Sequence, residues 1–301
     1  MAIDMSRLSA GVQLRPTVTR DIWAEALDSS AVASLVPSIQ MPGAGLEIDV
    51  ITGDPEAEWV GETEEKPVGI HTFGTKTLKP YKMALIEIFS DEFKRDKNAL
   101  YREISSRLPK ALGRLLDKTV LYGTAPGENF DVLSDVPVQK LGTTAQIGDN
   151  VLAINAAIAA AGHALSGWAL SPQGKAAMIG AKDSGGALLF SQDYTQSISL
   201  PRILGEPVYV SKAMYRGAIA ADPEAVPPVV AEDSVVGLAG DWSQARLGIV
   251  ERIKMKATTD ATVNKDGQQI NLWQRNMFGI LVEMEVGFVV NDKAAFVRLT
   301  K

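Results

Sequence analysis

Near the carboxyl end of the chain, hydrophobic and polar positions alternate with the period of a β-strand. Apolar side chains occupy every second position across residues 278–290, and acidic residues such as Glu283 stand between them. A second alternation at 249–256 places Lys254 on a basic face, and the Asp-Gly pair at 266–267 is a hairpin turn signal. The pattern predicts two long antiparallel strands with one apolar face, whose opposite charges bring Lys254 near Glu283.

A helical period occurs earlier in the chain. Apolar residues recur there at spacings of four and three, in a stripe that consists of Leu100, Ile104, Leu108, Leu112, Leu115 and Thr119. Gly123 is a good stop signal, so the stripe predicts a helix over about 92–122. Pro109 should kink or divide this helix. The apolar stripe is the natural cover for the apolar face of the predicted sheet.

The middle of the chain mixes helical and strand signals, which predicts one α/β unit over residues 150–250. The predicted elements are an alanine-rich helix at 151–165, a buried strand at 168–171, a helix that starts at Pro172, and a turn and strand at 204–210. Residues 83–89 are apolar on both faces apart from Glu87, which predicts a further buried strand.

The amino-terminal segment has few large apolar side chains. Thr19 can cap a short helix from Arg20 to about Ser30, and Pro37 and Pro42 then end regular structure. Such an arm cannot form a core of its own, so we expect it to lie across another surface.

A change of charge sign marks the segment that follows the arm. From residue 46 to 65 there are eight acidic residues and no basic one, and from 66 to 82 there are four basic residues and no acidic one. Opposite signs suit antiparallel limbs, so we expect a long hairpin with its tip near 61–69. A two-stranded ribbon is marginal in water, so this one needs a surface from outside. A solvated hairpin that folds back on its own domain is the competing interpretation.

The predicted long helix is basic, with eight basic and three acidic residues between Lys94 and Lys118. A solvated helix face is the simple explanation. The more specific explanation is that the basic helix binds the acidic limb of another copy, or enclosed nucleic acid, through its charge. The candidate subunit-interface residues are Glu58, Trp59, Glu62, Glu64, Glu65, Lys66, Lys76, Lys79, Arg107, Lys110 and Arg114.

Composition limits the kinds of site and partner that the chain could have. The chain has 301 residues, of which 46% are hydrophobic and 22% charged, so it has the composition of a globular protein. Its net charge of -6 argues against a generally basic surface that reads nucleic acid. There is no cysteine, which excludes disulfides, thiolate nucleophiles and zinc-thiolate sites. The most apolar stretch, 151–165, is too short to span a membrane.

No motif for catalysis, cofactor binding or metal binding is convincing. His71 and His163 lie far apart among apolar or small neighbours, so we interpret both as surface or packing residues. No Gly-x-Ser-x-Gly elbow occurs, and the glycine-rich segments lack the residues that would hold phosphates. We therefore expect no enzyme site, no cofactor and no metal.

Several segments, in their order along the chain, resemble the major capsid protein family of tailed bacteriophages, which has the Hong Kong 97-type fold. The residues that carry the resemblance are Ala57-Glu58-Trp59-Val60-Gly61-Glu62 with Pro67 and Phe73, Leu78 through Phe93, Asp117 through Gly123, Leu204 through Val208, Gly240-Asp241-Trp242, and Val289 through Leu299. Together they cover the chain from about residue 16 to its end.

The resemblance implies an α+β fold with four regions. These are an N-terminal arm (1–45), an extended hairpin loop (46–83), a peripheral domain (84–148 and 251–290) with a spine helix at about 92–122, and an axial domain (149–250 and 291–301). It further implies hexamers and pentamers that close into an icosahedral shell around double-stranded DNA. Scaffolding, portal and decoration proteins would be separate chains, with assembly in the host cytoplasm, and no membrane is implied.

Two alternatives remain at this point. The nearer one is an encapsulin, a cellular compartment with the same fold that encloses protein cargo. The remote one is a soluble α/β enzyme with its site on a loop of the 150–250 unit.

Overall fold

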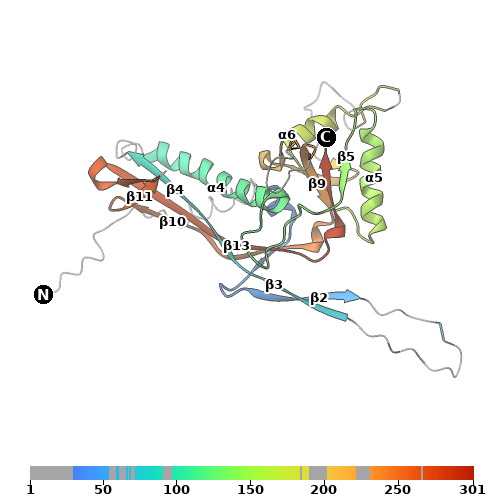
Figure 1. The fold of residues 1–301 in the computed structure, drawn as a ribbon, viewed down its shortest axis with the longest axis horizontal. Coiled ribbons are helices and arrows are strands. Elements are labelled where there is room, and N and C mark those ends of the chain that lie inside the picture. Colours follow the sequence, from blue (N-terminus) through green and yellow to red (C-terminus); the bar gives the residue numbers. More distant parts are fainter. Residues whose placement is uncertain are drawn as a thin grey trace.

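The computed structural model describes residues 30–53, 59–60, 66, 68, 72–90, 97–183, 185–189, 202–221, 231–265 and 267–301. The molecule is elongated, with a long helix on long strands at one end, a second sheet flanked by helices at the other, and a projecting hairpin (Figure 1). The helix expected over residues 20–30 lies outside the described residues, except for Ser30.

The predicted pair of long strands forms the centre of a four-stranded sheet. In spatial order its strands are β1 (Ser38–Gln40), β10 (Ala245–Thr258), β13 (Met277–Val290) and β4 (Tyr81–Ser90). Strands β10 and β13 are antiparallel, and Lys254 is the register partner of Glu283, so this prediction is confirmed. The turn at Gly267, with φ of 80°, belongs to a small separate hairpin, β11 (Thr262–Lys265) and β12 (Gln268–Asn271).

Two expectations about the strands that flank this pair are wrong. Regular structure does not stop between Pro37 and Pro42, because β1 pairs there in parallel with β10. Strand β4 is not buried on both faces, because it is an edge strand with alternating exposure, and Ile86 is 49% exposed. An apolar run cannot distinguish an edge strand from a central one, since position in the sheet depends on partners far away in the sequence.

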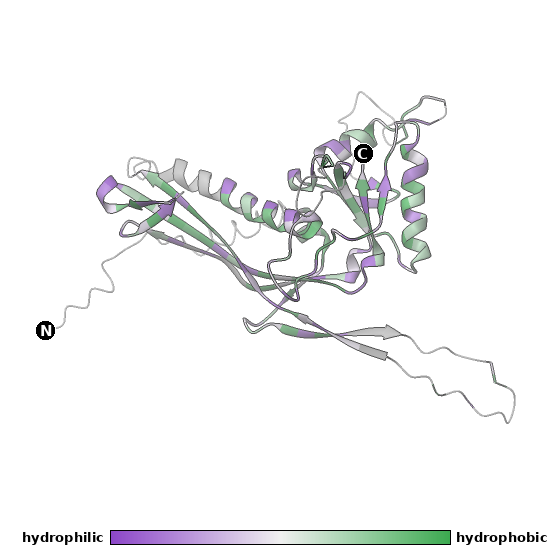
Figure 2. Cartoon of the chain, in the orientation of Figure 1, coloured by the Kyte–Doolittle hydropathy of each residue, from purple (hydrophilic) through white to green (hydrophobic). Residues whose placement is uncertain are grey.

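The long helix α4 (Lys97–Tyr122) covers one face of this sheet, as predicted. Among its described residues, the buried apolar side chains Leu108, Leu112, Leu116, Val120 and Leu121 share one core with the alternate apolar residues of β13. Figure 2 shows the hydrophobic residues gathered along the strands beneath α4. The prediction that Leu115 belongs to the buried stripe is wrong, because Leu115 is 44% exposed and Leu116 is buried instead. The helix also runs undivided through Pro109.

A six-stranded sheet forms the other end of the molecule. In spatial order its strands are β5 (Val138–Lys140), β14 (Phe296–Thr300), β9 (Val235–Gly240), β6 (Gly167–Leu170), β8 (Glu206–Val210) and β7 (Arg202–Ile203). Helices α5 (Ile147–Ala160) and α6 (Pro172–Ile179) share a core with one face. The other face contributes to the core beneath α4 and the short helix α2 (Ala31–Leu35).

Most predicted elements of this unit are confirmed. Strand β6 is fully buried, and Ser171 caps α6 with Pro172 at its start. The alanine-rich helix begins four residues earlier than predicted and ends five residues earlier. Its end follows from Gly162, whose φ of 83° leaves the helical region.

Three connections join the sheets: residues 123–137 lead from α4 to β5, and two short crossovers follow later in the chain. The turn η3 (Trp242–Gln244) leads from β9 to β10, and η5 (Lys293–Ala295) leads from β13 to β14. Strand β10 therefore extends across the division expected at 250/251. Strand β5, expected in the peripheral domain, pairs instead with β14 of the six-stranded sheet.

The predicted hairpin is present as β2 (Leu46–Gly53) and β3 (Thr72–Leu78), which pair antiparallel and project from the body (Figure 1). The expected pairing of opposite charges across it is wrong in the described part. Glu47 lies opposite Thr77, Asp49 opposite Thr75, and Lys76 opposite Ile48.

The base of the hairpin rests on two glycines of the four-stranded sheet. Gly248 and Gly287 are register partners, and they lie on the face away from α4. A Cβ on Gly248 would come within 2.4 Å of the side chain of Leu78, and one on Gly287 within 2.6 Å of the carbonyl oxygen of Lys79. Because neither glycine has a side chain, Leu78 and Met41 pack directly on the two strands. Val289 of β13 belongs to the same hydrophobic cluster.

We predict that Gly287→Ala destabilises the chain by roughly 1–3 kcal/mol, because the new methyl group collides with backbone rather than with a flexible side chain. Denaturant unfolding of the unassembled protein measures the effect. Gly279→Ala on the same strand is the matched control, since its methyl group would meet the end of the Leu272 side chain at 3.2 Å and the carbonyl oxygen of Glu87 at an ordinary contact distance of 3.9 Å. Equal stabilities for the two variants would contradict this account of the hairpin base.

Candidate subunit interface

The basic residue Lys76 holds the hairpin to the body of its own chain. Its ammonium lies 3.5 Å from the Asp131 carboxylate and donates a hydrogen bond to the carbonyl oxygen of Val290. Asp131 also accepts from the Val290 amide, at 2.8 Å. The structure therefore gives this predicted interface residue an intramolecular contact that fixes the direction in which the hairpin leaves the sheet.

A buried carboxylate holds the end of the arm. Asp117 of α4 accepts hydrogen bonds from the Ser30 hydroxyl (2.6 Å) and from the amides of Ala31 (3.2 Å) and Val32 (3.1 Å). Burial raises the pKa of Asp117, against hydrogen bonds from Ser211, Ser30 and these amides that lower it. The carboxylate thus supplies acceptors for amides at the start of α2, which have none within the helix.

The described residues near the hairpin tip are exposed. Trp59 has no contact that reduces its exposure, Val68 is 88% exposed, and Lys66 is exposed as well. Lys79 is exposed at the turn between β3 and β4. The other predicted residues of this region, Glu58, Glu62, Glu64 and Glu65, lie outside the described residues.

The basic residues of α4 form a row. Arg107, Lys110 and Arg114 follow at spacings of three and four and are all exposed, which places them on one side of the helix. The guanidinium Nε of Arg114 donates to the carbonyl oxygen of Lys110, at 3.0 Å. The structure brings these three predicted residues together, but it places them across the sheet from the hairpin base.

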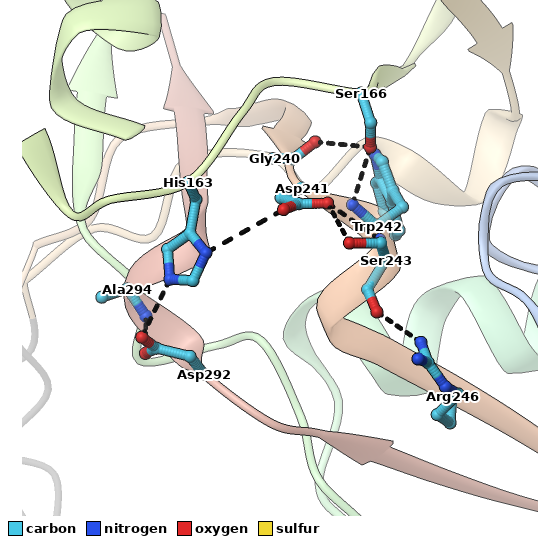
Figure 3. A network of polar contacts seen from close by, with 9 residues as sticks. All are labelled: His163, Ser166, Gly240, Asp241, Trp242, Ser243, Arg246, Asp292 and Ala294. Carbon is cyan, nitrogen blue, oxygen red and sulfur yellow. Dashed lines mark hydrogen bonds and ion pairs between the residues drawn. The ribbon is translucent and has the colours of Figure 1, made fainter. Parts of the chain in front are cut away.

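His163 has polar partners that the sequence does not indicate. Its Nε2 lies 3.0 Å from Oδ2 of Asp292, and its Nδ1 lies 3.9 Å from Oδ2 of Asp241 (Figure 3). The hydrogen bond with His163 is the largest of the causes that lower the pKa of Asp292. The interpretation of His163 as a surface or packing residue is therefore incomplete. His71 lies outside the described residues.

This group does not have the arrangement of a hydrolytic triad. The Ser243 hydroxyl donates to Asp241, at 2.6 Å, and not to the imidazole, so the histidine is in no position to activate it. Among the described residues, no group of three or more His, Asp or Glu side chains could hold a metal ion. Within that same part of the chain, no helix is long and apolar enough to cross a membrane.

The polar side chains described above attach one element to another. Asp117 holds the arm, Lys76 holds the hairpin, and His163 lies between the two crossovers. Such a molecule, with exposed residues on a projecting hairpin and on a basic helix, belongs to the class of structural proteins that associate through extended surfaces.

Comparison with known proteins agrees with this class. The model of the phage capsid family matches residues 10–301. The probable major capsid protein gp17 of Mycobacterium phage L5 is 31% identical over 302 residues, which cover 95% of this chain and 89% of that protein. The chain belongs to the phage capsid family, and the predicted function of a phage major capsid protein is confirmed.

Solved structures show the same fold. A chain of Gordonia phage Cozz superposes with a TM-score of 0.69 at 22% identity, covering 90% of this chain and 86% of the other. A chain of Mycobacterium phage Bobi gives the same TM-score at 21% identity, covering 90% of each chain. The mixed helix and sheet predicted from the sequence is therefore confirmed, and the encapsulin and enzyme alternatives are not favoured.

We predict that Asp117→Ala costs roughly 1–3 kcal/mol of stability, because the Ser30 hydroxyl and two amides lose their buried acceptor. The arm should then be cleaved by proteases faster than in the parent chain. Asp117→Asn keeps one carbonyl oxygen for these donors, so its loss should be smaller. Unchanged cleavage of the arm in Asp117→Ala would show that this carboxylate does not hold it.

Proposed function

We propose that this capsid protein has the Hong Kong 97-type arrangement and assembles as hexamers and pentamers into an icosahedral shell around the double-stranded DNA of a tailed phage. The observation that carries the proposal is the hairpin of β2 and β3. It leaves the body on the face of the sheet opposite α4, and Trp59 near its tip has no cover from its own chain.

The regions implied by the resemblance fit the observed elements after small changes. The described part of the arm contacts Asp117 of α4, and the extended loop corresponds to the hairpin of β2 and β3. Helix α4 on the four-stranded sheet corresponds to the peripheral domain. The axial domain corresponds to the six-stranded sheet with α5 and α6. Because β10 begins at Ala245 and β5 pairs with β14, we place the boundaries near 137 and 245.

The acidic tip of the hairpin and the basic row of α4 fit as partners between copies. The row consists of Arg107, Lys110 and Arg114, and it lies across the sheet from the hairpin base. The described limbs lead away from the chain's own helix, which favours a row on another copy as the partner. Exposed charge pairs are individually weak, so they set register and orientation more than affinity.

Burial of Trp59 supplies the apolar part of the proposed contact. A tryptophan that buries about 200 Å² contributes several kcal/mol before the costs of association. Each contact between copies is modest after those costs, and the closed shell persists because the contact is repeated many times.

The remaining partners belong to the same proposal. A chain with net charge -6 can enclose DNA without a strongly basic lining that would bind phosphates tightly. Scaffolding, portal and decoration proteins would be separate chains, and assembly would take place in the host cytoplasm before the particle is complete.

Charge reversal at the tip tests the contact. We expect Glu64→Lys with Glu65→Lys to block shell formation while the chain remains folded, because like charges then face the basic row. Electron microscopy and sedimentation measure assembly, and circular dichroism measures folding. Mixing this variant with a chain that carries Arg107→Glu, Lys110→Glu and Arg114→Glu should restore part of the assembly.

The matched control carries the same change of charge elsewhere. Glu128→Lys with Asp260→Lys alters two exposed acidic residues of the body, and this chain should assemble normally. Normal shells from the tip variant at ordinary salt would refute the charge contact.

Trp59→Ala tests the apolar part separately. We expect the concentration needed for assembly to rise at least tenfold, because each copy loses more than about 1.4 kcal/mol at the contact. The stability of the unassembled chain should not change, since Trp59 is fully exposed there. An unchanged assembly threshold would mean that Trp59 is not part of the interface.

A further inference from the structure

Three buried polar atoms without a hydrogen-bond partner lie at the carboxyl-terminal end of the six-stranded sheet. They are Nε of Arg216, Nε of Arg298 and Oγ1 of Thr300, and no described residue forms a hydrogen bond with any of them. Buried polar groups are nearly always hydrogen-bonded, because burial of an unpaired one removes its bonds to water without replacement. Three such atoms at one end of a sheet therefore indicate a group that binds there.

Strand pairing brings the three side chains to one face of the sheet. Val235 of β9 is the register partner of Thr300, and it also forms an antiparallel bridge with Arg216. Directly paired residues have their side chains on the same face, so these three residues form a row across the sheet. Arg298 lies two positions before Thr300 on β14, and alternation places both on that face. It is the face towards α4, because Val235 belongs to the core beneath this helix.

Other atoms of each guanidinium already have contacts. Nη1 of Arg298 donates to the carbonyl oxygen of Ser134, at 2.7 Å, and Nη2 of Arg216 donates to the Glu232 carboxylate. The guanidinium of Arg216 also lies over the ring of Tyr122, 5.9 Å from the ring centroid. These contacts fix the position of both groups, and they leave each Nε–H to donate to a further acceptor.

Arg298 is partly buried and has no carboxylate partner among the described residues. Asp135, whose charge acts on it, pairs with Lys293 at 2.9 Å. Glu232 pairs with Arg216. Burial lowers the pKa of Arg298, and the positive charge of Arg216 lowers it further. An anion between the two guanidiniums would compensate for both effects.

We propose that Arg216, Arg298 and Thr300 bind a small oxyanion with the size and charge of inorganic phosphate. Such an ion has several acceptor oxygens, so it can accept from both guanidiniums at once in charge-assisted hydrogen bonds. The Thr300 hydroxyl supplies a third donor. A water molecule could accept from one or two of these groups, but it would bring no charge to two neighbouring cations.

The burial of the site favours a free ion over the backbone of nucleic acid. Thr300 is 3% exposed and the side chain of Arg216 is 21% exposed, so the donors are recessed. A phosphodiester in a duplex is flanked by sugars on both sides and cannot enter such a recess, whereas phosphate or sulfate can. The bound ion would join β14 to the segment of Arg216. This binding belongs to the single chain, so it does not depend on the proposed assembly.

Equilibrium dialysis of the unassembled chain against radiolabelled inorganic phosphate tests the site. Sodium chloride keeps the ionic strength constant, so that a general effect of salt is excluded. We expect one phosphate bound per chain, and a rise of about 5 °C in the thermal unfolding midpoint at about a hundredfold excess over the dissociation constant. The absence of saturable binding to the parent chain would overturn the proposal.

Variants assign the bound ion to these residues. Arg298→Gln should weaken binding at least about tenfold, because the charge and the Nε donor are lost together. Arg298→Lys restores the charge without the planar fork, so it should recover part of the affinity. Thr300→Val keeps the shape of the side chain and should weaken binding about threefold. Circular dichroism checks that each variant is folded.

Arg202→Gln is the matched control. Arg202 is exposed, and its Nη1 donates to a backbone carbonyl oxygen, that of Gly205, as Nη1 of Arg298 does to Ser134. This variant should bind phosphate like the parent chain. Equal affinities of Arg298→Gln and the parent would place the bound ion elsewhere and overturn the assignment.

Competing anions identify the kind of ligand. Sulfate should displace the labelled phosphate, because it is a tetrahedral oxyanion of similar size. Acetate should need about tenfold higher concentration at the same ionic strength, since it has fewer acceptor oxygens and less charge. Short duplex DNA at an equal concentration of phosphate groups should not displace the label. Efficient displacement by acetate, or by DNA, would overturn the proposal of a recessed site for a free oxyanion.

Discussion

The antiparallel pairing of β10 with β13 is the interaction on which the other parts of the molecule depend. One face of the pair carries the core beneath α4, and the other carries the hairpin base on Gly248 and Gly287. Both strands continue through a crossover into the six-stranded sheet. A shift of register by one residue would exchange the two faces and remove the support of helix and hairpin together.

The same pairing separates the two charged surfaces. The row of Arg107, Lys110 and Arg114 and the base of the acidic hairpin belong to opposite faces of one sheet. The proposed contact would therefore join the hairpin of one copy to the row of another, because the sheet keeps the row and the hairpin base of one chain on opposite sides. Lys76, which lies at the hairpin base, contacts Asp131 and the Val290 carbonyl oxygen of its own chain.

The sequence predicts those features that depend on periodicity. The pairing of Lys254 with Glu283, the cover by α4, and strand β6 with α6 all follow from alternation or from caps, and the structure confirms them. The error at Leu115 arises because Leu115 and Leu116 are adjacent, so the stripe can continue through either. Which one is buried depends on the shape of the partner surface, which a helical period does not contain.

The contacts between distant segments could not be predicted from the sequence. Nothing local marks Gly248 and Gly287 as partners, and Asp117 looks like one more charge on a helix until Ser30 is placed against it. His163 is the clearest case, because Asp292 lies 129 residues away. For the interface, residue types and charge blocks named candidate side chains, such as Trp59, but not which of them face the same side of the molecule.

In this chain the stiff parts are continuous: α4 lies undivided on long strands, and α5 and α6 cover a fully buried β6. The junction consists of three connections and of a core that both sheets share, because Leu238 and Phe296 of the six-stranded sheet belong to the core beneath α4. A change of the angle between the two sheets would therefore require repacking of this shared core.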